Sequence, residues 1–360
     1  LAIEAGTGPC AQCLGFSNLV ALHWIRGEHD HAAEWGRRWI RAQPDGASAW
    51  ASLAWTYSYM QRPDSALPLM QRALSLSGGD TWASQEYTRM LLVGRRYDAA
   101  DSVIAAMEAS PSPGRREIAA DLRALLERER GRVESANRVI ESMMRSFPAA
   151  AGFGTMMRAG NLRMLGSHQE AARLFESGAH SPGERLSLPV PPASARAFCW
   201  HHALAADALA PLGDTVRLAA YADTLQRGCR DSFYGRDWRL YHHVRGLIAM
   251  RGGRHEEAER EFRQAVWSAA EGWARTIVEL ADAQLALGRP RDAIATLRAG
   301  YATRLDAMGR YVPISELDYR MARAFAQAGE NDSLRVYAGH VRRAWRDADP
   351  EIRRLLASLP

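Results

Sequence analysis

Apolar and polar residues in this chain alternate with the period of an α-helix, in pairs of short amphipathic stretches. The clearest pair lies within residues 47–80, where apolar residues stand at offsets 0, 3, 4 and 7 and again at 16, 20, 23 and 24: Trp50, Leu53, Ala54, Tyr57, Ala66, Met70, Ala73 and Leu74. Positions i, i+3, i+4 and i+7 share one face of a helix. Between the two stripes, residues 61–64 read Gln-Arg-Pro-Asp, a turn sequence. The segment therefore predicts two antiparallel helices joined by a turn.

The same pattern returns along most of the chain at intervals near 34 residues. The matching positions are Phe16, Leu19, Val20, His23, Gly27, Ala32 and Pro44; Gly94, Tyr97, Ala100 and Ile104; Gly131, Ala136, Ile140, Met143 and Pro148; Gly166, Ala171 and Phe175; Gly213; Gly253, His255, Ala258, Phe262 and Ala265; Gly288, Pro290, Ala293 and Leu297; and Gly329. Such a period is typical of proteins in which each hairpin buries its apolar face against the next. We predict about nine helical pairs.

This pattern resembles the tetratricopeptide repeat, which has a large residue, Leu, a small residue and an aromatic on helix A, and two Ala flanking a large residue on helix B. The resemblance covers most of the chain and implies an all-α fold, a right-handed α-solenoid of about nine helix–turn–helix units with a C-terminal capping helix. Ala54 and Ala66 suit close helix crossings. Leu218 and Leu334 depart from the pattern, which affects the local geometry and not the class.

The predicted organisation has five parts: an N-terminal segment (1–12), a first array of about five units (13–180), a connector (181–197), a second array of about four units (198–348) and a cap (349–360). The connector is rich in proline, which cannot continue a helix. It is either an inter-repeat loop, or a hinge or strand offered to a partner. The chain starts at Leu1 without a basic and apolar leader, so we expect a mature or excised form.

Two of the four cysteines are expected to form a disulfide. Cys199 begins helix A of the sixth unit and Cys229 ends its helix B. In an antiparallel hairpin these two ends are neighbours, within the roughly 4.4–6.8 Å between Cα atoms that a disulfide needs. We therefore predict a Cys199–Cys229 bond. Two pairable sets of cysteines favour an oxidising compartment, periplasmic or extracellular; the alternative is four reduced cysteines in the cytoplasm.

The other two cysteines, Cys10 and Cys13, form a C-x-x-C motif. Leu14 follows where a c-type haem site has His. A zinc site completed by His29 and His31 is disfavoured because these residues follow a helix whose start is on the order of 20 Å away. A Cys10–Cys13 disulfide or two free thiols remain.

Motifs of catalysis are absent from the sequence, which has no G-x-S-x-G, no H-E-x-x-H and no glycine-rich phosphate loop after a strand. We predict no enzyme, no cofactor and no metal site. Although the net charge is +5, arginines are spread as pairs among acidic residues, as at Arg95-Arg96 and Arg342-Arg343. Solvated helix faces explain this better than nucleic-acid binding. Apolar stretches stay short of the roughly 20 residues of a membrane span.

The resemblance also implies a site, because helices A of tetratricopeptide proteins line a concave groove that binds ligands. It places in or beside this groove Trp24, Trp55, Tyr59, Trp82, Arg89, Arg128, Phe153, Arg163 and Trp200. Aromatic residues and Arg are enriched where proteins bind each other. The alternative is that some of these rings pack between neighbouring units.

Three functions are compatible with such an array. The first is a scaffold that binds another protein. The second is a secreted structural protein that assembles with copies of itself, head to tail, into a filament. The third is a regulatory region of a larger bacterial kinase or transcription activator. The scaffold is the usual use of these arrays.

Overall fold

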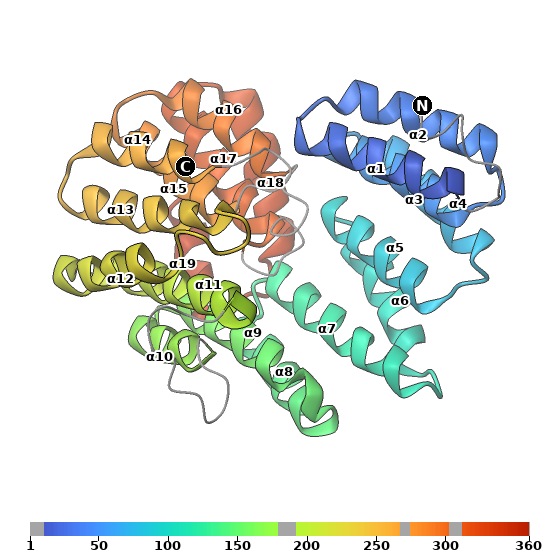
Figure 1. Ribbon diagram of the computed structural model, residues 1–360, viewed down its shortest axis with the longest axis horizontal. Helices are drawn as coiled ribbons and strands as arrows, with labels where there is room; N and C mark the ends of the chain where they lie inside the picture. Colours follow the sequence, from blue (N-terminus) through green and yellow to red (C-terminus); the bar gives the residue numbers. More distant parts are fainter. Residues whose placement is uncertain (1–10, 179–191, 267–273, 302–311, 360) are drawn as a thin grey trace.

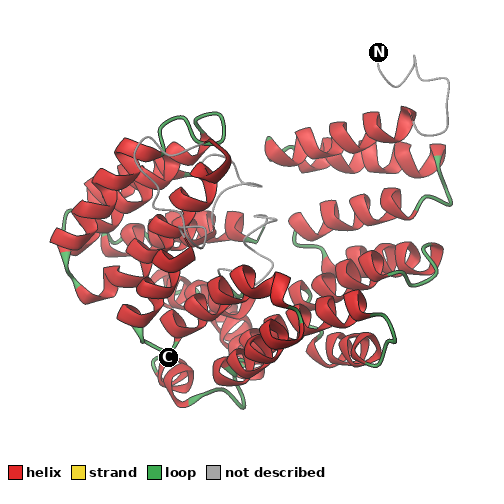
Figure 2. Cartoon of the chain, turned by 60° about the horizontal axis from the view of Figure 1, so that its bottom comes forward, coloured by secondary structure: helices red, strands yellow, loops and turns green. Residues whose placement is uncertain are grey.

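The computed structural model describes residues 11–178, 192–266, 274–301 and 312–359, in which all regular structure is helical (Figures 1 and 2). The α-helices are α1 Ala11–Ile25, α2 His29–Ala42, α3 Ala47–Tyr59, α4 Pro63–Leu76, α5 Thr81–Val93, α6 Tyr97–Glu108, α7 Pro113–Glu129, α8 Val133–Ser146, α9 Ala151–Met164, α10 His168–Gly178, α11 Pro192–Leu209, α12 Thr215–Gly228, α13 Arg239–Arg251, α14 His255–Ala265, α15 Ala274–Ala286, α16 Pro290–Gly300, α17 Ile314–Ala328, α18 Asn331–Ala344 and α19 Pro350–Ala357. None of them combines the length and apolar character needed to cross a bilayer.

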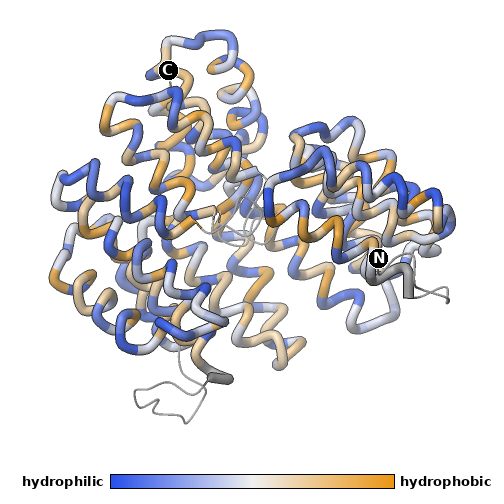
Figure 3. The backbone as a smooth tube through the Cα atoms, turned by 45° about the horizontal axis from the view of Figure 1, so that its top comes forward, coloured by the Kyte–Doolittle hydropathy of each residue, from blue (hydrophilic) through white to orange (hydrophobic). Residues whose placement is uncertain are grey.

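Consecutive helices pack as nine antiparallel hairpins, from α1–α2 to α17–α18, and each hairpin contacts the next. The predicted α-solenoid is therefore confirmed for the part of the chain that the structure describes. Polar and apolar residues alternate along the helices (Figure 3). The small residues at the crossings, among them Ala54 and Ala66, are fully buried, so backbones approach closely there.

Each hairpin turns through one residue in the left-handed conformation, just before its second helix. In seven hairpins this residue is Gly: Gly27, Gly131, Gly166, Gly213, Gly253, Gly288 and Gly329. In the second and third hairpins Gln61 and Arg95 take the same place, with φ of 56° and 59°. Gly adopts positive φ without steric penalty, which is why the glycines mark the repeat so clearly in the sequence.

The second half of the stack begins earlier than predicted. Helix α11 starts at Pro192, inside the predicted connector, because proline is tolerated in the first turn of a helix. The remainder of the connector lies outside the described residues. Phe175 of α10 and Phe198 of α11 belong to one buried cluster that continues to α15. The hairpins on either side of the connector therefore share a core.

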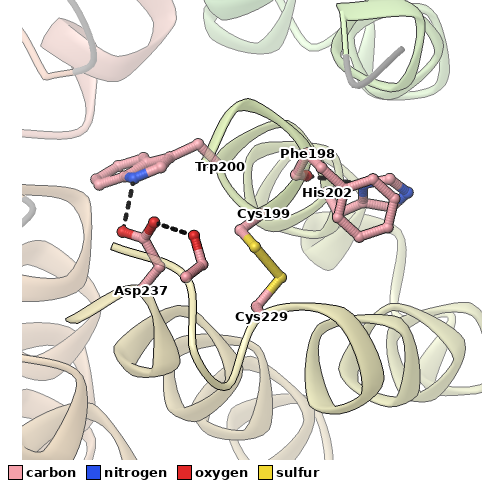
Figure 4. The surroundings of a disulfide bond; sticks show 7 residues. Phe198, Cys199, Trp200, His202, Cys229 and Asp237 are labelled. Carbon is pink, nitrogen blue, oxygen red and sulfur yellow. Dashed lines mark hydrogen bonds between the residues drawn. A yellow bond between two sulfur atoms is a disulfide. The ribbon is translucent and has the colours of Figure 1, made fainter. Parts of the chain in front are cut away.

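A disulfide joins Cys199 in α11 to Cys229 after α12, with the Cα atoms 5.8 Å apart (Figure 4). This is the bond that the hairpin argument predicts. Both residues are fully buried. The predicted Cys10–Cys13 pair involves Cys10, which lies outside the described residues.

The end of the stack packs back against its middle. Val133 at the start of α8 shares a buried cluster with Trp345 and Ile352. Asp349 ties the two parts together: its backbone N–H donates to the carbonyl of Gly131 at 3.0 Å, and its carboxylate accepts the N–H of Glu134 at 2.8 Å. Helices α17–α19 thus lie beside α7 and α8 (Figure 1). The solenoid is therefore closed on itself, because its C-terminal end is held against α8.

Candidate functional site

The aromatic residues predicted to line the groove of the first hairpins lie mostly inside the stack. Trp24 is buried, donates its Nε1–H to Thr56 at 2.9 Å and meets the ring of Tyr59 edge-on at 5.3 Å. Trp55 is also buried and donates to the carboxylate of Glu86 at 2.8 Å. These rings join α1, α3 and α5. They hold neighbouring hairpins together in the way that the packing alternative describes.

The other predicted groove residues also have internal partners or are half-buried, with one exception. Arg89 pairs with Glu86 at 3.0 Å, and Trp200 donates to Asp237 at 3.2 Å. Phe153 is half-buried and Arg128 fully buried. Trp82 is the exception, with 43% of its surface exposed. Contacts within a hairpin or with the next one therefore account for most of this burial, whereas Arg128 also lies near Arg275 and Glu316 of the C-terminal helices.

Helices α9, α11, α13, α15 and α17 face one another through an inner layer of charged side chains. Arg163 pairs with Asp207 at 2.7 Å and Arg275 pairs with Glu316 at 2.7 Å. The remaining members of this layer are His243, Glu279, Asp282 and Arg320. All five of these helices are the first of their hairpins, and first helices are the ones expected to line the groove. The charges are paired with each other, as buried charges must be.

Burial and neighbouring charges shift the pKa values of this layer in opposite directions. Burial, together with Asp207 and Asp282, raises the pKa of Glu279 to about 7. Burial also opposes ionisation of Glu316, but Arg275 and Arg320 outweigh it and lower the pKa of Glu316 to about 2. For Asp207 the effect of burial is likewise outweighed, by Arg163 first, and its pKa is well below the usual range.

These opposite shifts predict opposite effects of neutralising the two glutamates. The pKa of Glu279 is 4.5 in the unfolded chain and about 7 in the folded chain. The free energy of unfolding therefore falls as the pH rises from 4.5 to 7, because the unfolded chain loses this proton first. Glu279→Gln should therefore raise the free energy of unfolding at pH 8, by about 1–3 kcal/mol at 1.36 kcal/mol per pKa unit, and change it little at pH 5.

The matched control is Glu316→Gln, which removes a charge that the fold favours. The ionised carboxylate of Glu316 stabilises the fold above pH 4.5, its pKa in the unfolded chain, and this stabilisation is lost as the pH falls towards 2. This variant should lose about 3 kcal/mol at pH 8 because Arg275 loses its partner. Urea titrations at pH 5 and pH 8 measure both effects. Equal losses in the two variants at pH 8 would contradict the assignment.

Closure itself depends on charged groups from distant parts of the chain. The carboxylate of Glu129, at the end of α7, accepts the backbone N–H groups of Ile314 and Ser315 at 2.8 and 2.9 Å and so caps α17. Arg95 donates to both carboxylate oxygens of Asp318 in α17, at 2.6 and 2.5 Å. A carboxylate at a helix N-terminus satisfies N–H groups that the helix leaves free.

Closure also creates a surface feature that sequence reasoning missed. An open trough of about 840 Å³ runs along the turns of the second, third and fourth hairpins and is faced by α18. Its lining includes Arg95 and Arg96 from the third hairpin, Arg130 and Arg132 from the fourth, and three more arginines between residues 342 and 346. We name it the arginine trough. The sequence shows these residues as separate pairs, and no local signal indicates that they meet.

Among the described residues, no three His, Cys, Asp or Glu side chains are grouped in a way that could hold an ion. The buried charges of the inner layer are instead used in ion pairs.

Residues 47–80 match the sequence model of the tetratricopeptide repeat. No curated protein matches the chain in sequence. Among solved structures, the chain is similar to the Cut9–Hcn1 hetero-tetramer of the APC/C, with 11% identity and a TM-score of 0.35 over 95% of this chain and 74% of that one. The chain is also similar to the human IFIT1 dimer with PPP-AAAA, with 12% identity and a TM-score of 0.47 over 95% of this chain and 73% of that one. For the TPR domain of P58(IPK), the identity is 15% and the TM-score 0.25 over 95% of this chain and 96% of that one.

Proposed function

Because this chain is a tetratricopeptide repeat protein, we propose that it is a non-enzymatic scaffold that binds another protein. Such repeats typically mediate protein–protein interaction. The observation that carries the proposal is the state of the inner charged layer. Arg163 with Asp207 and Arg275 with Glu316 are ion pairs within the fold. These charges therefore stabilise a rigid body and are not available to a substrate, so recognition takes place on the outer surface.

A rigid body suits this task because its binding surface is already ordered. Side chains fixed before binding lose little entropy when the complex forms. Exposed apolar side chains are present on separate hairpins, including Trp82 on α5, Val216 on α12 and Tyr234 between α12 and α13. Positions of this kind can supply contacts at an interface. A regulatory region of a larger kinase or transcription activator would use the array in the same way.

The filament alternative has less support. Head-to-tail growth needs an uncovered stacking face at each end of the solenoid. At the C-terminal end, Trp345 and Ile352 are buried in a cluster with Val133 of α8. The apolar surface of these two residues is therefore covered within one chain, which leaves Val336 and Leu355 as the exposed large apolar side chains of α18 and α19.

We further propose that the scaffold works in a periplasmic or extracellular compartment. The Cys199–Cys229 disulfide supports this location, because disulfides persist in oxidising surroundings and are rare in the cytoplasm.

Two measurements test the scaffold. Light scattering of the native protein, with and without reductant, should give a single mass near 39.9 kDa; an indefinite series of masses would indicate the filament. A photo-crosslinking residue placed at Trp82, Val216 or Tyr234 should capture one discrete partner in extracts of the source cells. Adducts of the chain with itself alone, or none at all three positions, would overturn the scaffold proposal.

A further inference from the structure

The arginine trough carries an excess of positive charge. Seven arginines and three aspartates line it. Asp101, Glu127 and Asp318, which lie outside this lining, pair with Arg130, Arg132 and Arg95, so the excess is carried by the other arginines. We propose that the arginine trough binds an extended, acidic segment of a partner protein; this deepens the proposed scaffold function and rests on it.

The arginines divide into a floor and a rim. On the floor, Arg95 is held by Asp318, and Arg130 is held by Asp98 at 3.1 Å and Asp101 at 2.9 Å. These pairs orient the floor. Along the rim, Arg96 is 63% exposed with Asp64 at 3.9 Å, the limit of an ion pair. A ligand can form ion pairs with these water-exposed guanidinium groups of the rim.

The rim on the opposite side is supplied by α18. Arg343 is exposed there, and Arg346 just beyond the helix is 81% exposed, with Asp347 at 3.3 Å. Guanidinium groups therefore face the trough from both walls. A guanidinium presents two parallel N–H donors that match the two oxygens of a carboxylate. The trough already shows this geometry in its floor, where Arg95 binds Asp318 through Nε and Nη2.

The shape of the trough favours a linear ligand. It passes the turns that begin α4, α6 and α8, represented in its lining by Pro63, Tyr97 and Arg132. Packed helices lie about 8–10 Å apart, so the two intervals between these three turns cover at least about 16–20 Å. An extended chain advances about 3.3–3.6 Å per residue. A segment of at least about five or six residues is needed to cover this length, whereas a single small anion would contact one turn.

The composition of the trough favours carboxylates over a nucleic-acid strand. Asp64, Asp98 and Asp347 interrupt the positive lining and would repel a continuous row of phosphates. Single-stranded nucleic acid is also held by exposed aromatic rings on which bases stack. The one aromatic residue of the lining, Tyr97, is only half-exposed and packs against apolar clusters. A peptide with acidic residues at intervals avoids both difficulties.

The test uses the full chain and a fluorescent twelve-residue peptide in which Glu and Asp alternate with Ala and Ser. Fluorescence anisotropy should show binding that weakens as salt is raised. The double variant Arg96→Glu, Arg343→Glu should reduce affinity at least tenfold. A matched control, Arg291→Glu with Arg335→Glu, makes the same change of charge at exposed positions outside the trough lining and should bind within twofold of the wild type.

The outcomes separate the competing explanations. Equal binding of the same peptide with Gln and Asn in place of its acids would overturn the proposal, as would an equal loss in the control variant. Tighter, competing binding of an oligothymidine would assign the trough to nucleic acid and overturn it as well. Thermal melting checks that both double variants fold. If the peptide fails while photo-crosslinks at Trp82 or Tyr234 still capture a partner, the trough proposal falls and the scaffold function stands.

Discussion

Replacing Asp318 by Asn should lower the free energy of unfolding by about 3–5 kcal/mol, the range for breaking a buried ion pair. The carboxylate of Asp318 is 1% exposed and accepts two hydrogen bonds from Arg95 and one from the hydroxyl of Tyr301, at 2.6 Å. An amide cannot accept all three, and it leaves the charge of Arg95 without its counter-ion. Because Arg95 belongs to the third hairpin and Asp318 to the ninth, the loss falls on closure of the solenoid.

Urea denaturation at pH 7, followed by circular dichroism, measures this effect. The matched control is Asp332→Asn on α18, whose carboxylate is 94% exposed and pairs with an exposed Arg335. Exposed pairs contribute about 0–1 kcal/mol, so the control should unfold close to the wild type. If Asp318→Asn loses less than about 1 kcal/mol, the pair does not hold the two parts of the chain together.

Removal of the disulfide should have the second largest effect. Closing a loop between residues 30 positions apart stabilises the folded state by roughly 3–4 kcal/mol in the chain-entropy model. The variant Cys199→Ala, Cys229→Ala should therefore unfold at a clearly lower urea concentration than the oxidised wild type. The loss arises mainly in the unfolded chain, which becomes free to expand.

Reductant supplies the control for this prediction. It should destabilise the wild type to about the level of the double variant and leave the double variant unchanged. Without reductant and in denaturant, the wild type should expose at most two reactive thiols, those of Cys10 and Cys13, and four after reduction. Four reactive thiols before reduction would show that the bond does not form in the protein as isolated.

The sequence was informative about contacts between close neighbours in the chain. The helical stripe from Trp50 to Tyr57 and the turn glycines locate the hairpins, because an amphipathic period and a positive φ are properties of a few consecutive residues. The disulfide is also a contact between near neighbours in the chain, since both cysteines belong to one hairpin. In two turns the left-handed residue is not glycine but Gln61 or Arg95, without a sequence signal; Gly94, just before Arg95, has a negative φ of −77°.

Packing of the aromatic rings between units was one of the two alternatives that the sequence left open, but the burial of the two arginines was beyond sequence reasoning. Arg128 and Arg163 stand at positions that face the inside of the superhelix, as the resemblance implies, but whether the inside is open depends on the whole stack. Arg128 is fully enclosed by the chain, and this burial lowers its pKa to about 10. The arginine trough shows the reverse case, in which residues far apart in the sequence are brought together.

The sequence by itself determined the repeating hairpins, their number and the bond between Cys199 and Cys229, because each depends on residues that lie within one repeat or its neighbour. The tertiary structure decided the closure, the inner ion pairs and the arginine trough. Arg95 and Asp318 are separated by 223 positions, and they meet only because small rotations between successive hairpins add up along the stack. That sum is set by the packing of every interface at once, so no segment of the sequence encodes it.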